Sequence, residues 1–250
     1  MSERIILITG ASGGIGSALA RTYARPGVAL LLWGRDATRL EEAAAACRAK
    51  GAECHVERFD LRDLGALAAR LAAADAATPI DIAIFNAGLG GTAPAGAVAE
   101  TPEASRAVAD VNFVAPVTGA NAMAAVMAKR GRGQIVLIGS IAESFPLPMA
   151  PTYAATKAGL RMFAEALGMR LARHGVSVTL VSPGFIDTAM SRQVTEPKPF
   201  LMSADKAAAI IARGIERKAR TIVLPWQFAV IRGVAGLLPR AILRGVLSRA

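Results

Sequence analysis

A tyrosine and a lysine at positions i and i+4 are the residues of this chain whose types and spacing are most suggestive of chemistry. Tyr153 and Lys157 stand in the run Tyr-Ala-Ala-Thr-Lys, and Ser140 ends the apolar run 134–140 that precedes them. On a helix such positions share a face, so the lysine ammonium would lie beside the phenol. A nearby positive charge lowers the pKa of about 10 that a free tyrosine has. The trio predicts proton exchange with an alcohol, although Tyr-x-x-x-Lys alone occurs by chance in many helices.

A glycine-rich turn near the N-terminus suits a dinucleotide. The apolar run 5–9 has the look of a buried parallel strand, and a helical pattern over 17–25 follows the turn Thr-Gly-Ala-Ser-Gly-Gly-Ile-Gly. Glycines let the backbone approach a pyrophosphate, and the N–H groups of the helix start hold the anion. The spacing Gly-x-x-x-Gly-x-Gly is one residue longer in its first gap than the commoner fingerprint. A glycine turn with only structural duties is the alternative.

The elements that must position these residues alternate between strands and helices. Strands are expected at residues 5–9, 29–33, 53–59, 80–85, 134–140, 177–182 and 221–224, and helices at 17–25, 37–50, 64–77, 102–129, 153–174 and 204–219. This alternation predicts an α/β fold: a single doubly wound parallel sheet, Rossmann-like, with helices on both faces. We expect one domain over residues 1–225, with 226–250 as a basic, apolar extension of it. Ligands should gather at the carboxyl ends of the strands, where all the motifs map.

In this order, the motifs resemble those of the short-chain dehydrogenase/reductase family, in its branch of about 250 residues, and the resemblance extends from residue 5 to about residue 223. The family's glycine motif falls on a turn that contains Gly10, Ser12, Gly14, Ile15 and Gly16. Its Asn-Ala-Gly motif falls on Asn86, Ala87 and Gly88, its catalytic tetrad on Asn112, Ser140, Tyr153 and Lys157, and its Pro-Gly on Pro183 and Gly184. Phe85 departs from the second asparagine of many relatives, at a position that is not catalytic.

The resemblance implies reversible hydride transfer between a nicotinamide ring and a carbonyl carbon. Tyr153 would donate the proton to the developing alkoxide, and Ser140 would orient that oxygen. Lys157 would lower the pKa of the tyrosine and hold the nicotinamide ribose. Asn112 would interrupt its long helix and anchor a water that connects Lys157 to solvent, although alone it could be a helix-surface amide.

Other cofactor contacts are also implied by the resemblance. Asp60 and Leu61 would border the adenine, with the Asp60 carboxylate accepting from its amino group, and Asn86, Ala87 and Gly88 would line the adenosine ribose. Around the nicotinamide, the resemblance places Pro183, Gly184, Ile186 and Thr188. Each could instead be an ordinary turn residue, and Asp60 could be a helix cap.

The choice between NAD and NADP depends on the end of the second predicted strand, Gly34-Arg35-Asp36. An acidic side chain there grips the adenosine ribose, whereas an arginine accepts the extra phosphate of NADP. The family's deciding position falls on Gly34, and Asp36 precedes the helical pattern 37–50 as an N-cap would. We therefore expect NADP(H) rather than NAD(H), with Arg35 as charge partner and Ser12 as a phosphate donor. Arg35 as a solvated surface cation is the alternative.

Composition bounds the remaining possibilities. The chain of 250 residues is 53% hydrophobic, which is sufficient for one sizeable core. Its two cysteines, Cys47 and Cys54, fit a reducing compartment, and its two histidines have no metal-ligand neighbours, so no metal is expected. The first predicted strand begins too early for a signal peptide. These features favour a cytoplasmic protein.

The sequence says less about the substrate than about the cofactor. Two loops beside the expected nicotinamide site, 141–151 and 188–203, are mostly apolar, which favours a hydrophobic ketone or alcohol as substrate, although apolar loops also serve simple packing. Members of the family form dimers or tetramers through helices that correspond to 102–129 and 153–174, so we expect a homodimer or homotetramer. A regulatory or scaffold protein that binds cofactor without turnover is the alternative function.

The C-terminal segment is strongly basic. Residues 206–250 hold nine Lys/Arg and one acid, and this charge of 9 − 1 = +8 is most of the chain's formal +10. No nucleic-acid recognition motif accompanies it, so nucleic-acid binding is not expected. Prolines and arginines break the segment too often for a spanning helix of about 20 residues. Its basic, aromatic pieces suit peripheral contact with an anionic membrane, and packing on the substrate pocket or on a second subunit is the alternative.

Overall fold

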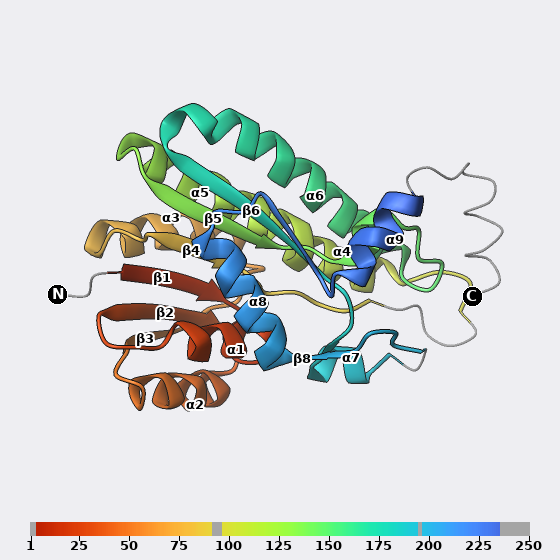
Figure 1. Cartoon of the computed structure of the whole chain (residues 1–250), viewed down its shortest axis with the longest axis horizontal. Coiled ribbons are helices and arrows are strands. Elements are labelled where there is room, and N and C mark those ends of the chain that lie inside the picture. Colours follow the sequence, from red (N-terminus) through yellow and green to blue (C-terminus); the bar gives the residue numbers. More distant parts are fainter. Residues whose placement is uncertain (1–3, 92–96, 195–196, 236–250) are drawn as a thin grey trace.

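A computed structural model of the chain describes residues 4–91, 97–194 and 197–235, and it shows a parallel sheet between two layers of helices (Figure 1). The strand order is β3-β2-β1-β4-β5-β6-β9. These strands are β1 (Arg4–Thr9), β2 (Val28–Gly34), β3 (Glu53–Arg58), β4 (Ile82–Phe85), β5 (Gly133–Ile138), β6 (Val176–Pro183) and β9 (Thr221–Leu224). The predicted fold class is confirmed, and each predicted strand is present within a few residues of its expected bounds.

The strands form because β-branched and leucine side chains are buried on both faces of the sheet. In β1, Ile6, Leu7 and Ile8 are fully buried, and successive side chains point to opposite layers. Leu7 pairs with Leu31 of β2 on one side and with Ala83 of β4 on the other. This two-sided burial is typical of parallel sheets and brings all the strand ends to one edge.

Each face of the sheet is covered by three main helices (Figure 1). One layer consists of α1 (Gly14–Tyr23), α2 (Ala37–Arg48) and α8 (Ala204–Glu216), and the other of α3 (Leu64–Ala77), α5 (Ala115–Lys129) and α6 (Pro151–Leu171). The buried cysteines Cys47 and Cys54 are free thiols within the first layer's core.

Side-chain caps fix where several of these helices begin. Asp36 accepts a hydrogen bond from the backbone N–H of Arg39 at 3.0 Å, which confirms its predicted role as the N-cap of α2. Asp63 caps α3 and Ser203 caps α8 in the same way. At α1 the situation differs, because no side chain among the described residues caps Gly13 at its N-terminus.

The long helix predicted over 102–129 is interrupted in its middle. Helix α4 (Pro102–Ala109) passes through a π-helical turn, η1 (Asp110–Val114), into α5. The expected local interruption at Asn112 is thereby confirmed. By length and composition this helix could cross a membrane, but half of its most apolar window is buried in the protein, and α5 packs on α3 and α6. It is therefore a core helix.

Short elements connect the main ones at both edges of the sheet. A 3₁₀ turn, η2 (Ile141–Ser144), follows β5 at the carboxyl edge, and another, η3 (Ala172–His174), links α6 to the start of β6 at the amino edge. After β6 come β7 (Ile186–Asp187), α7 (Ala189–Arg192) and β8 (Met202–Ser203), of which β7 and β8 pair in parallel. Helix α9 (Gln227–Ala235) begins the predicted C-terminal extension. Three of the extension's arginines, Arg240, Arg244 and Arg249, lie outside the described residues.

Candidate active site

The four residues of the expected tetrad converge at the carboxyl edge of the sheet. Ser140 directly follows β5, Tyr153 and Lys157 lie in the first turns of α6, and Asn112 lies in the π-helical turn. The Lys157 Nζ is 5.6 Å from the centroid of the Tyr153 ring, and the Ser140 hydroxyl is close enough to the Tyr153 phenol to lower its pKa. The structure therefore brings the sequence-predicted set together around one point.

The environment of Tyr153 differs from the expectation in its charge balance. Burial raises the pKa of Tyr153 above its ordinary value, the Ser140 hydrogen bond lowers it, and the negative charge of Glu143 raises it. The predicted lowering of this pKa by the lysine ammonium is not among these effects and stays a prediction. The Lys157 Nζ lies beside the Tyr153 ring and donates its hydrogen bond to the Ile138 carbonyl.

Lys157 is itself buried, and burial makes its charged form less favourable than it is in water. Its ammonium donates to the carbonyl oxygen of Ile138 at 2.9 Å, which ties α6 to the end of β5. Burial lowers the pKa of Lys157 to about 8, against an opposing effect of Glu143. A lysine in this state can donate a hydrogen bond as an ammonium or as a neutral amine near neutral pH.

Asn112 holds the segment that follows β4. Its Oδ1 accepts from the Leu89 N–H at 2.7 Å, and its Nδ2 donates to the Leu89 carbonyl at 2.9 Å. A Cβ at Gly88 would lie 3.4 Å from Asn112 Oδ1 and 4.0 Å from Lys157 Nζ. The π-helical turn thus aims a buried amide at this segment and sets it beside the lysine. The expected water between Asn112 and Lys157 stays a prediction.

The glycine turn needs glycine for its backbone conformation and for its tight internal packing. Gly10 and Gly14 have φ values of 66° and 56°, in the left-handed region that favours glycine. A Cβ at Gly16 would lie 2.3 Å from the Gly10 carbonyl oxygen. The start of α1 beyond them presents N–H groups, with Ile15 half-buried in its first turn. Backbone N–H groups and the helix dipole fit the pyrophosphate of a dinucleotide.

Asn86 supports this turn from the end of β4. Its Nδ2 donates to the carbonyl oxygens of Thr9 at 3.0 Å and Gly10 at 3.2 Å. The Thr9 hydroxyl in turn accepts from the N–H groups of Asn86 and Ala87. The Asn-Ala-Gly segment therefore connects the glycine turn to the tetrad, and its expected contact with the adenosine ribose stays a prediction.

Cationic side chains gather at the end of β2. Arg35 is exposed, and a Cβ at Gly34 would lie 3.2 Å from Ser12 Oγ, so the residues expected to meet the extra phosphate are neighbours. Arg39 was missed by the sequence reasoning, yet its Nη2 is 3.9 Å from a Cβ placed at Gly13. Its signal was its place in the first turn of the helix after the second strand.

Asp60 and Leu61 follow β3 at the same edge. The Asp60 carboxylate pairs with Arg62, and this bond is the main reason that the pKa of Asp60 is lowered. Its role as a helix cap is excluded, because Asp63 caps α3. Leu61 is buried. The Asp60 contact with an adenine amino group stays a prediction, in which the carboxylate would be shared with Arg62.

The residues expected around the nicotinamide lie at the end of β6 and just after it, and Thr188 faces the glycine turn. Pro183 and Ile186 are buried, and Gly184 is half-buried. A Cβ at Gly14 would lie 3.2 Å from Thr188 Cγ2, which brings the two cofactor segments together. The Thr188 hydroxyl accepts from the Ser191 N–H at 3.3 Å as the N-cap of α7, a second role beside its expected place at the nicotinamide.

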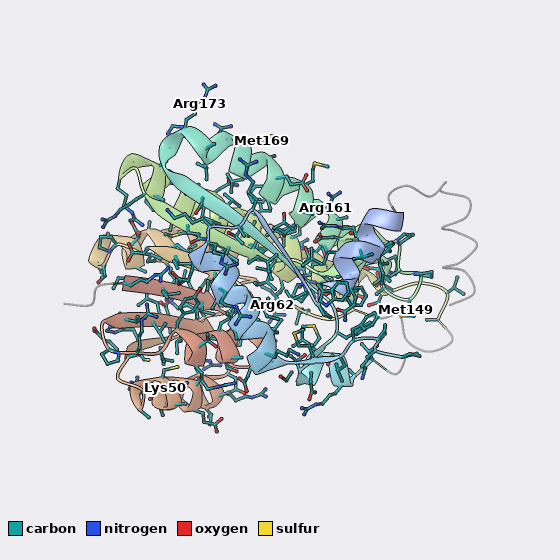
Figure 2. All side chains as sticks on the ribbon, viewed as in Figure 1. Lys50, Arg62, Met149, Arg161, Met169 and Arg173 are labelled. Carbon is teal, nitrogen blue, oxygen red and sulfur yellow. The ribbon has the colours of Figure 1, made fainter. Side chains whose placement is uncertain are left out.

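Apolar side chains are exposed on both loops that flank the site. Met149 is 38% exposed on one loop, and Met190, Phe200 and Leu201 are 39%, 47% and 52% exposed on the other. Met149 lies at the end of the molecule near α9 (Figure 2). Exposed apolar groups of this kind fit an apolar guest better than a charged one.

Comparisons with known proteins agree with this geometry. A family model described as short chain dehydrogenase matches residues 4–199. An uncharacterized oxidoreductase of Myxococcus xanthus is 33% identical over 250 residues, which cover 100% of this chain and 98% of the relative. A short-chain dehydrogenase from Sphingobium yanoikuyae, solved in complex with NADPH, superposes with a TM-score of 0.81 at 30% identity and covers 92% of this chain and 93% of its own.

A further solved structure has a substrate class in its description. The bulky-bulky ketone specific alcohol dehydrogenase from Comamonas testosteroni superposes with a TM-score of 0.79 at 28% identity, over 96% of this chain and 97% of its own. The match in sequence extends through most of the chain, and the match in structure includes the sheet and the edge that carries the tetrad. The chain belongs to the short-chain dehydrogenase/reductase family of oxidoreductases.

Proposed function

We propose that the protein is an NADP(H)-dependent oxidoreductase that interconverts a carbonyl and a secondary alcohol, with Tyr153 as the acid and base. The observation that carries the proposal is the meeting of Ser140, Tyr153 and Lys157 at the strand edge, beside a glycine turn open to a dinucleotide. A bound nicotinamide would supply or accept the hydride. The family membership supports the reaction class, and the position of Tyr153 beside Ser140 and Lys157 supports its role as the acid and base.

In the reductive direction, the residues of the chain donate one proton to the substrate and stabilise the substrate oxygen. The Tyr153 hydroxyl donates its proton to the substrate oxygen as negative charge develops there, because the raised pKa keeps the phenol protonated near neutral pH. Ser140 donates a hydrogen bond that stabilises the same oxygen. Lys157 sits behind the ring and would hold the nicotinamide ribose with its remaining N–H groups.

Removal of the phenol tests the role of Tyr153. Tyr153→Phe should keep NADPH binding, measured by fluorescence titration, and lose turnover by about 10²-fold or more, the usual scale of acid–base catalysis. An alternative, a cofactor-binding scaffold protein without turnover, predicts that the wild-type protein binds NADPH but reduces no ketone in a broad screen. A Tyr153→Phe variant with near-full turnover would contradict the assignment.

The preference for NADP(H) rests on the charges at the end of β2. Gly34 has no acidic side chain to repel a phosphate, a Cβ placed there would lie 3.2 Å from Ser12 Oγ, Arg35 follows it in the sequence, and Arg39 lies near Gly13. The NADPH complex of the Sphingobium relative supports this choice. Arg35→Ala should raise the KM for NADPH far more than that for NADH, because only NADPH carries the extra phosphate. Equal changes in the two constants would contradict it.

An apolar ketone or alcohol is the proposed substrate class. The exposed methionines and aromatics of the two loops support it, as does the description of the Comamonas enzyme as specific for bulky-bulky ketones. A series of aryl ketones of increasing size, assayed with NADPH, should show kcat/KM that rises with apolar area until the pocket is filled. A preference for small charged carbonyls would contradict the proposal.

Assembly through α6 is also a proposal. Met162 and Met169 are 60% and 74% exposed on this helix, and Met169 projects away from the sheet (Figure 2). Two such helices from two copies would cover these side chains, as in a homodimer or homotetramer. Light scattering coupled to gel filtration should report a mass of at least two chains, and Met169→Glu should lower it.

We propose a cytoplasmic protein that makes peripheral contact with a membrane, and the membrane contact is proposed from α9. Trp226, directly before α9, is 69% exposed, and Val230 and Ile231 in this helix are 54% and 42% exposed, ahead of a basic segment in the sequence. Exposed aromatic and aliphatic groups beside positive charge suit an anionic lipid surface. Sedimentation with vesicles of anionic lipid should carry the full-length chain down, and deletion of 226–250 should abolish it.

A further inference from the structure

Helix α9 packs onto the loops that form the proposed site. The Phe228 ring is buried, and its Cε2 lies 2.4 Å from the place where a Cβ would begin at Gly184. The same ring meets Phe200 edge-on, with centroids 5.6 Å apart and an interplanar angle of 86°. The C-terminal helix thus contacts both the segment expected around the nicotinamide and the substrate loop.

A buried carboxylate makes a third connection between α9 and the site. The Glu143 side chain, three residues after Ser140 in the turn η2, has 0% exposure. Its Oε1 accepts from Ser182 Oγ at 2.8 Å and lies 3.4 Å from Arg232 Nη1. Its N–H donates to the Ser140 carbonyl at 3.1 Å. One side chain therefore joins the catalytic turn, the end of β6 and α9.

Glu143 is fully buried, at a position where an apolar side chain would stabilise the fold better. Its Oε2 is buried and has no hydrogen-bond partner among the described residues, and it lies 2.8 Å from a Cβ placed at Gly139. A buried charge with an unsatisfied oxygen is destabilising, and well-packed apolar replacements often improve stability. Glu143 and Arg232 line one small crevice together with Phe145, Ser182 and Phe228. Stability alone does not account for this residue.

We propose that Glu143 is a positioning residue of the active site, which fixes the turn that bears Ser140 through its bonds to Ser182 and to Arg232 of α9. Under this proposal the C-terminal helix is part of the catalytic apparatus, because Arg232 holds the carboxylate that holds the turn. The inference rests on the proposed function for its kinetic consequences. It does not rest on it for the structural coupling between η2 and α9.

The charge of Glu143 also acts on the two titrating groups of the site. Its carboxylate raises the pKa of Tyr153 and opposes the lowering of the pKa of Lys157, both on α6. Burial raises the pKa of Glu143 itself, and Ser182, Arg232 of α9, the Ser140 backbone and Arg161 of α6 lower it. These are the charged and polar groups that face Glu143 from α6, α9, β6 and η2. A change in its charge should therefore move the pH profile.

The test uses full-length protein with three variants and one control. Glu143→Gln keeps the shape and removes the charge, Arg232→Met removes the cation, and the double variant removes both. Arg21→Met is the matched control, because it breaks an ion pair of 2.6 Å between α1 and Asp205 of α8, away from η2. Each is assayed for NADPH affinity by fluorescence, for kcat and KM with an aryl ketone, and for amide hydrogen exchange of residues 227–235.

We expect kcat to fall by about 10²-fold in Arg232→Met, because a displaced catalytic turn loses orientation, while NADPH affinity changes little. The double variant should be no worse than the worse single variant, because both act through one link. Amide exchange in α9 should rise in all three variants and stay unchanged in Arg21→Met. Glu143→Gln should move the tyrosine-dependent limb of the alcohol-oxidation profile to lower pH, because the carboxylate raises the pKa of Tyr153, whereas Arg232→Met, which keeps the carboxylate, should not.

Two results would overturn the proposal: unchanged amide exchange in α9 of Glu143→Gln and Arg232→Met, or kinetic losses that add in the double variant. A pH profile that does not move in Glu143→Gln would remove the electrostatic part. The exchange measurement needs no substrate. If the wild-type protein reduces no ketone, the proposed function fails while the coupling of η2 to α9 is still decided.

Discussion

The buried lysine of the site makes a prediction that needs no substrate. Lys157 is 5% exposed, and its pKa falls from an ordinary 10.5 to about 8 on folding. Each pKa unit is worth about 1.4 kcal/mol, so folding carries a cost of about 3 kcal/mol when the lysine is charged in both states. Below about pH 8 the lysine is charged in both states, so the folded state bears the whole of this cost. Between about pH 8 and pH 10.5 the unfolded chain binds a proton that the folded chain does not, so stability rises with pH.

Comparison with Lys157→Met isolates this effect from other titrating groups. The free energy of unfolding from urea titrations, wild type minus Lys157→Met, should become more favourable to the wild type by about 2–3 kcal/mol between about pH 7 and pH 10. Lys206→Met, on the exposed side of α8, is the control and should show a flat difference. A flat difference for Lys157→Met as well would refute the reasoning, because the lysine would then keep its charge in the folded state.

Three further variants test other contacts. Asp75→Ala removes a buried partner whose oxygens lie 2.6 and 2.8 Å from Arg130 Nη1, and it should cost about 3–5 kcal/mol in urea unfolding; a change below about 1 kcal/mol would argue that solvent replaces the pair. Asn112→Ala breaks both bonds to Leu89 and should cost about 2 kcal/mol in the same assay, together with most turnover. Gly16→Ala should weaken NADPH binding by about tenfold or more in calorimetry, because its Cβ would lie 2.3 Å from a carbonyl oxygen; unchanged affinity would mean that the turn adapts.

The fold was predictable because its determinants are local. Two-sided apolar runs such as 5–9 form strands wherever a sheet can cover both faces, and the cap at Asp36 acts within its own helix. The meeting of the tetrad at one edge followed from the parallel topology, since carboxyl ends of parallel strands share an edge. The paired strands β7 and β8 were not predicted, because two residues in each are too short for a periodic pattern.

The electrostatics of the site could not be read from spacing. The i and i+4 arrangement placed Lys157 beside the Tyr153 ring, but burial, which depends on the whole fold, sets both pKa shifts. Glu143 and Arg232 lie 89 positions apart, and the sequence holds no pattern that joins them. An acidic residue in the otherwise apolar loop 141–151 was the available signal, and its partner required coordinates.

Because no side chain caps the start of α1, the stability of the folded chain should depend on the supply of the proposed dinucleotide. Helices α2, α3 and α8 have a side-chain cap at their first turn, whereas α1 begins at Gly13 and Gly14 without one, which leaves its N–H groups for the proposed dinucleotide. A dinucleotide at about 100 times its Kd would add about 2.7 kcal/mol to the free energy of unfolding. A cell depleted of that nucleotide would hold a chain that opens more often to proteases. The amount of this protein in the cell would then rise and fall with the concentration of its dinucleotide cofactor.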